Sequence, residues 1–260
     1  MINIPQVKPG AAFPPLPVRR GDRVFILTGA GISAESGVKT FRDNGGLWEQ
    51  HRVEDVATPE GFERDPVMVW RFYSQRRAQL GEVRPNPAHE ALARLERHLG
   101  GGLYLCTQNV DPLHEKAGSQ RVVHMHGELA RTSCSRPGCA RTAPFADERQ
   151  YLGPEELPRC PCGALLRPAV VWFGEVPHGL AEIFTELSGC DLFLTIGSSG
   201  AVHPAAGFVS HLRNEPSTRT GRFAKTVYVG LERPDNAHAF DECRLGKAGE
   251  LLPTLFELIE

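Results

Sequence analysis

Short runs of apolar residues recur along the chain and predict the strands of a buried sheet. Within these runs, β-branched and aromatic side chains follow one another without alternating with polar ones. This pattern is typical of parallel strands that are covered on both faces. The runs occupy residues 23–28, 103–107, 169–173, 191–196 and 226–231.

Helical patterns lie between these runs. Residues 87–99 place apolar side chains such as Leu92 and Leu95 on one helical face, and the glycines that follow end the predicted helix. We also expect helices at residues 177–187 and 251–259. Strands that alternate with helices predict an α/β fold with a Rossmann-like, doubly wound parallel sheet.

Two segments interrupt this alternation. Residues 42–85 contain charged, aromatic and helix-like stretches, and residues 127–168 contain Pro, Gly and a cluster of cysteines. We expect both to be insertions that form a smaller helical and metal-binding domain, with the active site in the cleft between the two domains. The sheet domain would then comprise residues 18–41, 86–126 and 169–260, and residues 1–17 would be a loose Pro-rich arm.

The nearly balanced charge of the chain bears on whether it binds nucleic acids. With 29 Lys and Arg against 31 Asp and Glu, the net charge is −2, which argues against a protein that binds mainly the backbone of nucleic acids. No apolar run approaches the length of a membrane span, and the first residues lack the pattern of a secretion signal. We expect a cytoplasmic protein. Its oligomeric state stays open, and a monomer is compatible with the sequence.

Four of the 7 cysteines lie in one short stretch. Without a secretion signal, such a cluster favours a metal site over a set of disulfides. Four thiolates on two loops can bind one structural Zn²⁺ tetrahedrally, and such a closed site stabilises a small domain. The spacing is uneven, which leaves open a site with fewer ligands. The predicted ligands are Cys134, Cys139, Cys160 and Cys162.

A glycine-rich turn follows the first strand run. Gly29 and Gly31 stand where main-chain N–H groups approach a pyrophosphate in dinucleotide-binding folds. The third glycine of the usual fingerprint is absent, because Ala34 occupies its position. An ordinary tight turn between a strand and a helix is the alternative.

Polar residues follow the second strand run. Gln108, Asn109 and Asp111 would point into the ligand crevice at the carboxyl edge of the sheet, or Asp111 would cap the next helix. A short apolar pair then leads to His124 and His126. Imidazole suits a general base near neutral pH, although without further evidence the pattern favours a structural role for either histidine.

These segments together resemble the sirtuin family, the NAD-dependent lysine deacylases. The resemblance rests on GAGIS at residues 29–33, on GVKTFRD and GLW within residues 37–48, on TQNVDPLH at 107–114 and on the His-Gly pair at 126–127. The motifs occur in the family's order between about residues 23 and 252. Many relatives have Pro-Asp where this chain has Lys39 and Thr40, and Asn where it has Gly230.

The resemblance implies the site and the chemistry. His126 would be the general base, with Asn109 as a second catalytic residue. The lysine amide oxygen would attack the nicotinamide ribose, and the products would be lysine, nicotinamide and 2′-O-acyl-ADP-ribose. NAD would be bound by Gly29, Ala30, Gly31, Ser33, Phe41, Arg42, Trp48, Gln108, Asn109, Asp111, Gly197, Ser198, Ser199, Gly230, Leu231, Glu232 and Ala248.

The substrate would be an acylated lysine of another protein. A tyrosine and an arginine three residues apart share a helical face and can bind a carboxylate. Together with a small residue at position 57, this pair resembles class III sirtuins and implies removal of succinyl and malonyl as well as acetyl groups. The predicted substrate residues are Ala57, Tyr73, Arg76, Val171, Trp172, Phe173, Gly174 and Glu175.

Two other functions remain open at this point. One is an NAD-dependent ADP-ribosyltransferase on the same scaffold, with a protein side chain as the acceptor. The other is a non-catalytic module that binds NAD or acyl-lysine. The presence of His126, Asn109 and Asp111 argues against the module.

Overall fold

The computed structural model describes residues 13–38, 47–48 and 51–260. Its centre is a parallel sheet of 6 strands in the order β12-β11-β10-β2-β5-β6. The predicted α/β fold with a Rossmann-like sheet is confirmed. In chain order the strands are β2 (Val24–Thr28), β5 (Leu103–Thr107), β6 (Val122–His124), β10 (Leu192–Ile196), β11 (Lys225–Gly230) and β12 (Glu242–Leu245).

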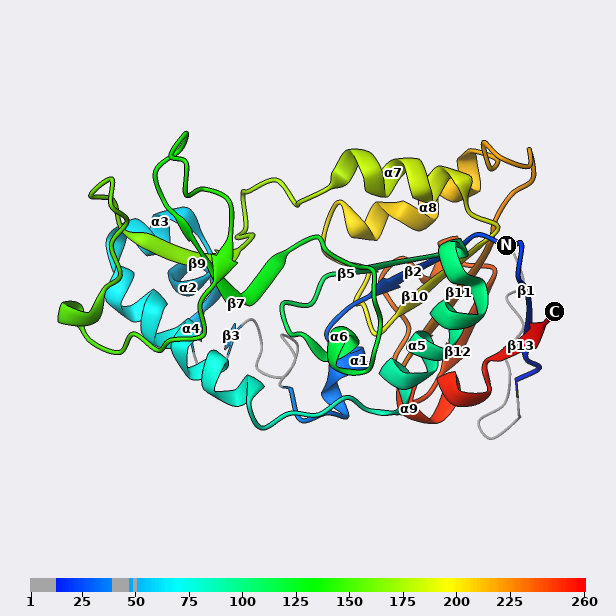
Figure 1. Ribbon diagram of the computed structural model, residues 1–260. Coiled ribbons are helices and arrows are strands. Elements are labelled where there is room, and N and C mark those ends of the chain that lie inside the picture. Colours follow the sequence, from blue (N-terminus) through cyan, green and yellow to red (C-terminus); the bar gives the residue numbers. More distant parts are fainter. Residues whose placement is uncertain (1–12, 39–46, 49–50) are drawn as a thin grey trace.

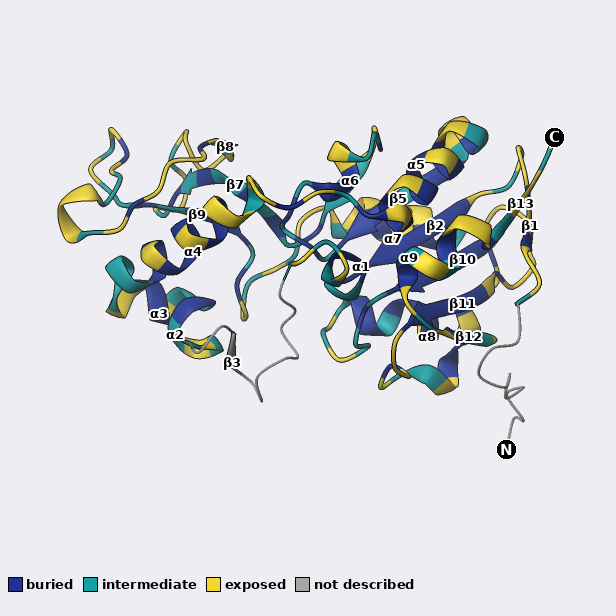
Figure 2. Cartoon of the chain, turned by 90° about the horizontal axis from the view of Figure 1, so that it is seen from below, coloured by how far each residue is buried: buried dark blue, intermediate teal, exposed yellow. Residues whose placement is uncertain are grey.

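Helices cover both faces of this sheet. In Figure 1, α7 (Leu180–Gly189) and α8 (Phe208–Asn214) lie over one face, whereas α5 (Pro87–Leu99) and α9 (Ala248–Leu251) lie over the other. Successive residues of β2 therefore point into two separate cores: Val24 and Ile26 pack on the α5 side, and Phe25 and Leu27 on the α7 side. Accordingly, the sheet strands are buried and the outer helix faces exposed in Figure 2.

Shorter elements connect these layers. The helices α1 and α6 follow β2 and β5, at the carboxyl edge of the sheet, and four 3-10 helices complete the domain. The bounds are α1 (Gly31–Ala34), α6 (Leu113–Lys116), η1 (Gly100–Gly102), η3 (Ala205–Gly207), η4 (Ala237–Ala239) and η5 (Leu252–Thr254).

The prediction for α5 is confirmed. The helix begins after Asn86, whose side chain accepts a hydrogen bond from the N–H of Ala88 at 2.9 Å. Its predicted apolar face, which includes Leu92 and Leu95, is buried against the sheet. The helix ends at Gly100, whose φ of 58° favours glycine.

The second domain combines helices with a small antiparallel sheet (Figure 1). The order in this sheet is β8-β7-β9. Trp70 and Phe72 of its longest helix pack with Leu129, Leu166 and Val170 of the sheet in one core. The elements are β3 (Leu47–Trp48), β4 (His51–Arg52), α2 (Val53–Val56), α3 (Pro59–Arg64), α4 (Pro66–Leu80), β7 (Gly127–Cys134), β8 (Phe145–Ala146), η2 (Pro154–Glu156) and β9 (Leu166–Val170).

The apolar run at residues 169–173 was assigned to the wrong sheet. Its first residues belong to β9, which pairs antiparallel with β7 in the small domain. Leu166 and Val170 pack there against the α4 aromatic rings, and the chain leaves the strand after Val170. A short apolar run indicates burial, but it does not indicate which core buries it.

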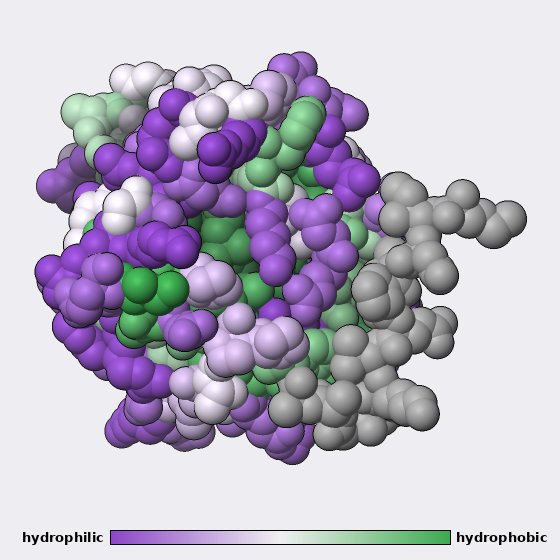
Figure 3. Space-filling view, turned by 90° about the vertical axis from the view of Figure 1, so that its right-hand side faces the viewer, coloured by the Kyte–Doolittle hydropathy of each residue, from purple (hydrophilic) through white to green (hydrophobic). Residues whose placement is uncertain are grey.

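Both ends of the described chain also differ from the prediction. The expected helix at residues 251–259 is wrong, because the chain forms η5 and then the strand β13 (Phe256–Ile259). This strand pairs in parallel with β1 (Leu16–Arg19), whose Leu16 and Val18 are buried. The arm is therefore anchored from Leu16 onward, while residues 1–12 lie outside the described residues. Figure 3 views this end of the molecule, where hydrophilic side chains predominate.

Within the part of the chain that the structure describes, no helix is both long and apolar enough to cross a membrane.

Candidate active site

A cavity of about 740 Å³ opens between the two domains, at the carboxyl edge of the parallel sheet. Its walls come from chain segments that are far apart in the sequence. The predicted site residues that line it are Gly29, Ala30, Gly31, Ala57, Tyr73, Gln108, Asn109, Asp111, His126, Val171, Trp172, Phe173, Gly174, Glu175, Gly197, Ser198, Ser199, Gly230, Leu231, Glu232 and Ala248.

A few predicted site residues are not part of this lining. Ser33 is buried beneath the cavity, and Arg76 is buried beside it. Phe41 and Arg42 lie outside the described residues, as does the side chain of Trp48. Other lining residues were not predicted, either because they are apolar members of a motif, such as Val38 and Val110, or because they lie outside the motifs. The full set is Ala34, Glu35, Val38, Val110, Val170, Pro177, Val202, His203, Tyr228 and Gly246.

Glycines allow two loops to touch on the floor of the cavity. The N–H of Gly31 donates to the carbonyl of Gly197 at 2.8 Å. A Cβ atom at position 31 would lie 2.7 Å from the Cα of Gly197, a distance that real Cβ contacts do not reach. The turn after β2 therefore needs glycine here, so that its main chain reaches the loop after β10 and faces a ligand directly.

A buried hydrogen-bond chain fixes the polar residues that follow β5. The amide of Asn109 donates to the Ser33 hydroxyl oxygen at 3.1 Å, and that hydroxyl donates to Asp111 at 3.0 Å. Burial raises the pKa of Asp111, and the hydrogen bonds from the Leu113 N–H and from Ser33 oppose this shift. Ser33 thus contributes by orienting the two side chains that face the cavity.

His126 lies in the turn between β6 and β7 and lines the cavity. Its Nδ1 atom is 3.1 Å from the carbonyl oxygen of Gln108. An N–H at Nδ1 satisfies this carbonyl and leaves Nε2 as the basic nitrogen. Burial lowers the pKa of His126 below its usual 6.5, so the ring is neutral at pH 7 and can accept a proton.

The residue after His126 must be glycine, because a side chain there would clash with the neighbouring strand. Gly127 has a φ of 80°, and a Cβ atom there would lie 2.2 Å from the carbonyl oxygen of Ala169 in β9. The His126 carbonyl in turn accepts a hydrogen bond from the N–H of Val171 at 2.8 Å. The His-Gly pair therefore joins the predicted general base to the segment predicted to bind substrate.

The predicted acyl pocket is built around Tyr73 of α4. The indole N–H of Trp172 donates to the Tyr73 hydroxyl oxygen at 2.9 Å. Burial raises the pKa of Tyr73 above its usual 10, so the phenol keeps its proton. On the same helix, the Arg76 guanidinium lies 3.3 Å from the centre of the Phe72 ring and donates to the Phe72 carbonyl at 2.9 Å.

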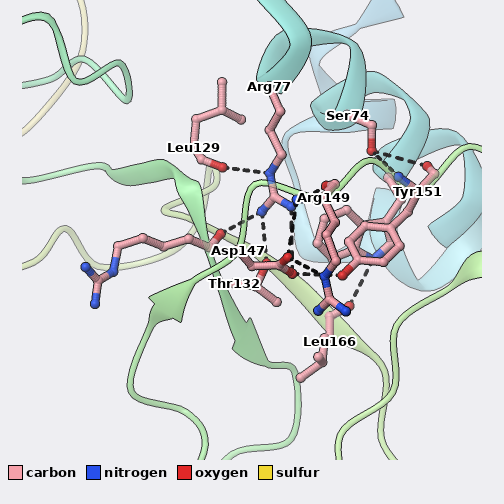
Figure 4. Close-up of polar contacts among 10 residues, drawn as sticks. Ser74, Arg77, Leu129, Thr132, Asp147, Arg149, Tyr151 and Leu166 are labelled. Atoms are coloured by element: carbon pink, nitrogen blue, oxygen red, sulfur yellow. Dashed lines mark hydrogen bonds and ion pairs between the residues drawn. The ribbon is translucent and has the colours of Figure 1, made fainter. Parts of the chain in front are cut away.

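The next residue of α4, Arg77, attaches this helix to the small sheet (Figure 4). Its Nε atom donates to the Leu129 carbonyl at 2.8 Å, and Nη1 donates to the Arg149 carbonyl at 2.9 Å. Its Nη2 atom donates to the carbonyl of Arg131 and to the hydroxyl of Thr132, each at 2.9 Å. The side chain is only 1% exposed, so the protein itself satisfies its donors.

Asp147 neutralises this buried arginine from 3.9 Å away (Figure 4). Burial alone would raise the pKa of Asp147, but hydrogen bonds from Arg149, Tyr151 and Thr132 outweigh burial and lower it. The carboxylate thus stays ionised beside Arg77, and the helix that carries Tyr73 and Arg76 is fixed to the sheet through buried polar contacts.

Replacing Arg77 with methionine is expected to lower the free energy of unfolding by about 3 kcal/mol, because it breaks a buried ion pair and leaves several buried carbonyls without their donor. Urea unfolding followed by circular dichroism measures the change. Arg71→Met on the exposed face of the same helix is the control, and it should cost less than about 1 kcal/mol. Equal losses for both variants would contradict the role given to Arg77.

The clustered cysteines converge despite their uneven spacing. The four sulfur atoms all lie within 4.8 Å of one another. Sγ atoms are 3.6 Å apart for Cys134 and Cys162, and 3.7 Å apart for Cys139 and Cys160. Sulfurs at about 2.3 Å from a tetrahedral zinc ion are about 3.8 Å apart. The set therefore fits a structural Zn²⁺ held by four thiolates.

The tight turn at Cys160 explains how the closely spaced pair reaches one ion. Its ends are joined by hydrogen bonds from Gly163 N–H to the Cys160 carbonyl and from Cys160 N–H to the Ala164 carbonyl, each 2.8 Å. Gly163 has a φ of 87°, which glycine adopts readily. Both cysteines thus point toward the pair carried by β7 and its following loop.

Protein purified without added metal is expected to contain about one zinc ion per chain, as measured by atomic emission. Strong chelators should lower its melting temperature, because a structural zinc site contributes directly to folding. The variant Cys162→Ser should lose the metal, whereas Cys243→Ser, outside the cluster, should keep it. A metal content near zero in the unmodified protein would disprove the zinc site.

Comparison with known proteins points to one family. A model of the Sir2 family matches residues 29–204. A protein of Pasteurella multocida (strain Pm70) named NAD-dependent protein deacylase is 50% identical over 238 residues, which cover 89% of this chain and 95% of that protein. A protein of the same name from Escherichia coli (strain K12) is 49% identical over 240 residues, with 90% and 81% covered.

Solved structures agree with this match. A Sir2 homologue in complex with NAD has a TM-score of 0.76 and 36% identity, covering 91% of this chain and 89% of that one. A mutant Sir2 homologue with ADP-ribose has a TM-score of 0.79 and 37% identity, with 91% of both chains covered. Sir2 bound to an acetylated peptide has a TM-score of 0.72 and 28% identity, with 88% and 90% covered.

Proposed function

The chain belongs to the Sir2 family, and we propose that it is an NAD-dependent deacylase that removes acyl groups from lysine side chains of proteins. The observation that carries the proposal is the meeting of His126, Asn109 and the glycine loops in one cavity. The relatives named NAD-dependent protein deacylases support the activity. The Sir2 structure with an acetylated peptide supports an acyl-lysine substrate.

The residues around the cavity fit NAD. The touching main chains of Gly31 and Gly197 provide a surface without side chains for a pyrophosphate. Asn109 and Asp111 offer an amide and a carboxylate for ribose hydroxyls and the carboxamide. Ser198 and Glu232, which line the part of the cavity beside β10 and β11, would hold the adenosine. When bound, NAD supplies the electrophilic sugar carbon that takes the acyl oxygen.

At position 230 this chain has glycine where many relatives have Asn, and the side chain of Tyr228 occupies the space. A Cβ atom at Gly230 would lie 2.3 Å from the hydroxyl oxygen of Tyr228. Glycine at this position therefore makes room for the tyrosine, which lines the cavity. In this chain a phenol takes up space that a side chain at position 230 would occupy.

The chain's own residues then account for the chemistry. His126 is neutral and would accept a proton at Nε2 from a ribose hydroxyl of bound NAD. The main chain of residues 171–175 follows the cavity wall and pairs with an extended substrate peptide. Its position is set by the Phe173 N–H, which donates to the Ala57 carbonyl at 2.9 Å.

The acyl pocket favours groups that end in a carboxylate. Tyr73 lines the cavity, keeps its proton and can donate, and Arg76 follows it on the same face of α4. A phenol next to a guanidinium binds a carboxylate by charge-assisted hydrogen bonds. We include succinyl and malonyl groups in the proposed substrates for this reason.

A panel of peptides tests the function. Acetyl-, malonyl-, succinyl- and long-chain acyl-lysine peptides are incubated with the protein, with and without NAD, and the free-lysine peptide is measured by mass spectrometry. We expect deacylation only with NAD, and succinyl removal at least as fast as acetyl removal. No deacylation of any peptide with NAD would overturn the proposal.

We also propose a cytoplasmic location. The described cysteines are all unpaired, and the four-thiolate site needs a compartment that keeps thiols reduced. Fractionation of cells that express the chain would place it there, and recovery from an oxidising compartment would contradict the proposal.

A further inference from the structure

Two histidines hold consecutive main-chain carbonyls of the loop that follows β5. The Nδ1 atom of His126 is 3.1 Å from the carbonyl oxygen of Gln108, and the Nδ1 atom of His124 is 2.9 Å from that of Asn109. The chemistry proposed above uses His126. His124 has the same type of contact one residue further along, at the residue expected to face the nicotinamide ribose.

The second nitrogen of His124 also has an acceptor. Its Nε2 atom lies 2.8 Å from Oε1 of Glu115 in α6. A neutral imidazole carries one N–H, so it can donate to only one of the two oxygens, whereas the doubly protonated ring donates to both. The side chain of His124 is 9% exposed and that of Glu115 is 41% exposed. The geometry therefore suits an imidazolium held between a carboxylate and a peptide carbonyl.

Three polar groups of Asn109 have a partner in this arrangement. Its N–H donates to the Thr107 hydroxyl at 3.0 Å, and its side-chain amide donates to Ser33 at 3.1 Å. Its carbonyl receives the hydrogen bond from His124. A charge-assisted hydrogen bond is stronger than a neutral one. Loss of the His124 contact would therefore leave the main-chain carbonyl of Asn109 less firmly held.

We propose that His124 is a positioning residue of the deacylation reaction, which holds the main-chain carbonyl of Asn109 in place while Glu115 orients its ring. The proposal rests on the proposed function, because Asn109 matters there through the NAD site. His124 itself touches neither substrate nor reacting atoms, and it acts through Asn109.

The charges around His124 favour its protonated form. Burial alone would lower the pKa of His124, but the hydrogen bond and charge of Glu115 outweigh burial and raise it. Glu128 of β7 acts in the same direction through its charge, and Asp111 also interacts with the ring. The pKa of nearby His114 is well below its usual value, because this residue is buried, so His114 adds no charge at neutral pH.

This arrangement gives a pH dependence with a definite sign. Because the pKa of His124 is raised above the usual 6.5, the ring keeps its second proton to a higher pH than a free imidazole does. It loses this proton as the pH rises through that pKa, and one of its two hydrogen bonds is then lost. The pKa of His126 is lowered, so its own proton is lost at a lower pH. In a plot of kcat against pH, His126 therefore controls the loss of rate at low pH, and His124 the loss of rate at high pH.

An NMR titration of histidine-labelled protein tests the contact without any substrate. We expect the His124 ring to titrate above pH 6.5 in the unmodified protein and at a lower pH in Glu115→Gln. Glu128→Gln is the matched control. It also removes one negative charge near His124, but Glu128 makes no hydrogen bond to the His124 ring. A His124 ring that titrates at or below 6.5 in the unmodified protein would overturn the proposal. So would a ring that responds equally to both substitutions.

Kinetics test the effect on the reaction. For His124→Gln we expect kcat at pH 7 to fall about tenfold with a smaller change in KM, and the loss of rate at high pH to disappear. The low-pH loss, set by His126, should remain. Retention of the high-pH loss in this variant would contradict the positioning role. If the unmodified protein removed no acyl group, the proposed function would fail, while the NMR result would still decide whether the contact exists.

Discussion

Replacing His126 with alanine is expected to reduce deacylation by about 10²- to 10⁴-fold, the usual contribution of a general base. His126 is the neutral imidazole of the cavity, with Nδ1 at the Gln108 carbonyl and Nε2 as its basic nitrogen. The substitution removes the base without removing any residue proposed to hold the pyrophosphate. NAD binding and the melting temperature should therefore change little.

Steady-state rates with an acetylated peptide, together with calorimetric titration of NAD, measure the two effects separately. His238→Ala, an exposed histidine outside the cavity lining, is the control and should keep its activity. In the unmodified protein, kcat should fall as the pH decreases through the lowered pKa of His126, because the protonated ring cannot act as a base. Near-normal turnover by the alanine variant would refute the assignment.

Replacing Arg76 with methionine is expected to lower desuccinylation by about 10- to 100-fold, since a hydrogen bond to a charged group contributes about 1.5–3 kcal/mol. Arg76 shares a face of α4 with Tyr73 and acts on its hydroxyl. Its guanidinium lies over the Phe72 ring, so binding of a carboxylate requires the side chain to turn toward the cavity. Methionine keeps the buried volume and removes the charge.

The ratio of kcat/KM for succinyl and acetyl peptides isolates this effect. An acetyl group carries no carboxylate, so deacetylation should fall far less than desuccinylation. Arg71→Met on the exposed face of the same helix should leave the ratio unchanged. Equal losses of both activities in Arg76→Met would remove the basis for a carboxylate pocket.

The local spacing of apolar residues correctly predicted those elements that pack against a single hydrophobic core. The apolar spacing of residues 87–99 defined α5 because a single helical face packs on the sheet. The run at 169–173 failed because burial in the small domain leaves the same pattern as burial in the parallel sheet. The strand pair of Leu16–Arg19 with Phe256–Ile259 joins opposite ends of the chain, and no local signal marks such a partner.

Within the site, the motifs found many of the residues that line the cavity, but not further lining residues such as His203 and Tyr228, and not the partners that hold the site residues in place. The pairs Arg77–Asp147 and Glu115–His124 join different elements, and neither member of a pair identifies the other in the sequence. The uneven cysteine spacing argued for caution about zinc. The positive φ of Gly163 allows a turn that brings all four sulfurs together, and spacing alone does not reveal that turn.

The fate of NAD during the reaction shows whether this chain consumes NAD to remove acyl groups from lysine. The protein is incubated with an acylated peptide and NAD labelled in its adenosine half, and all products are separated and counted. We expect one nicotinamide for each lysine freed, with the acyl group and the label together in 2′-O-acyl-ADP-ribose. Label attached to protein, or lysine freed without consumption of NAD, would contradict the proposed function.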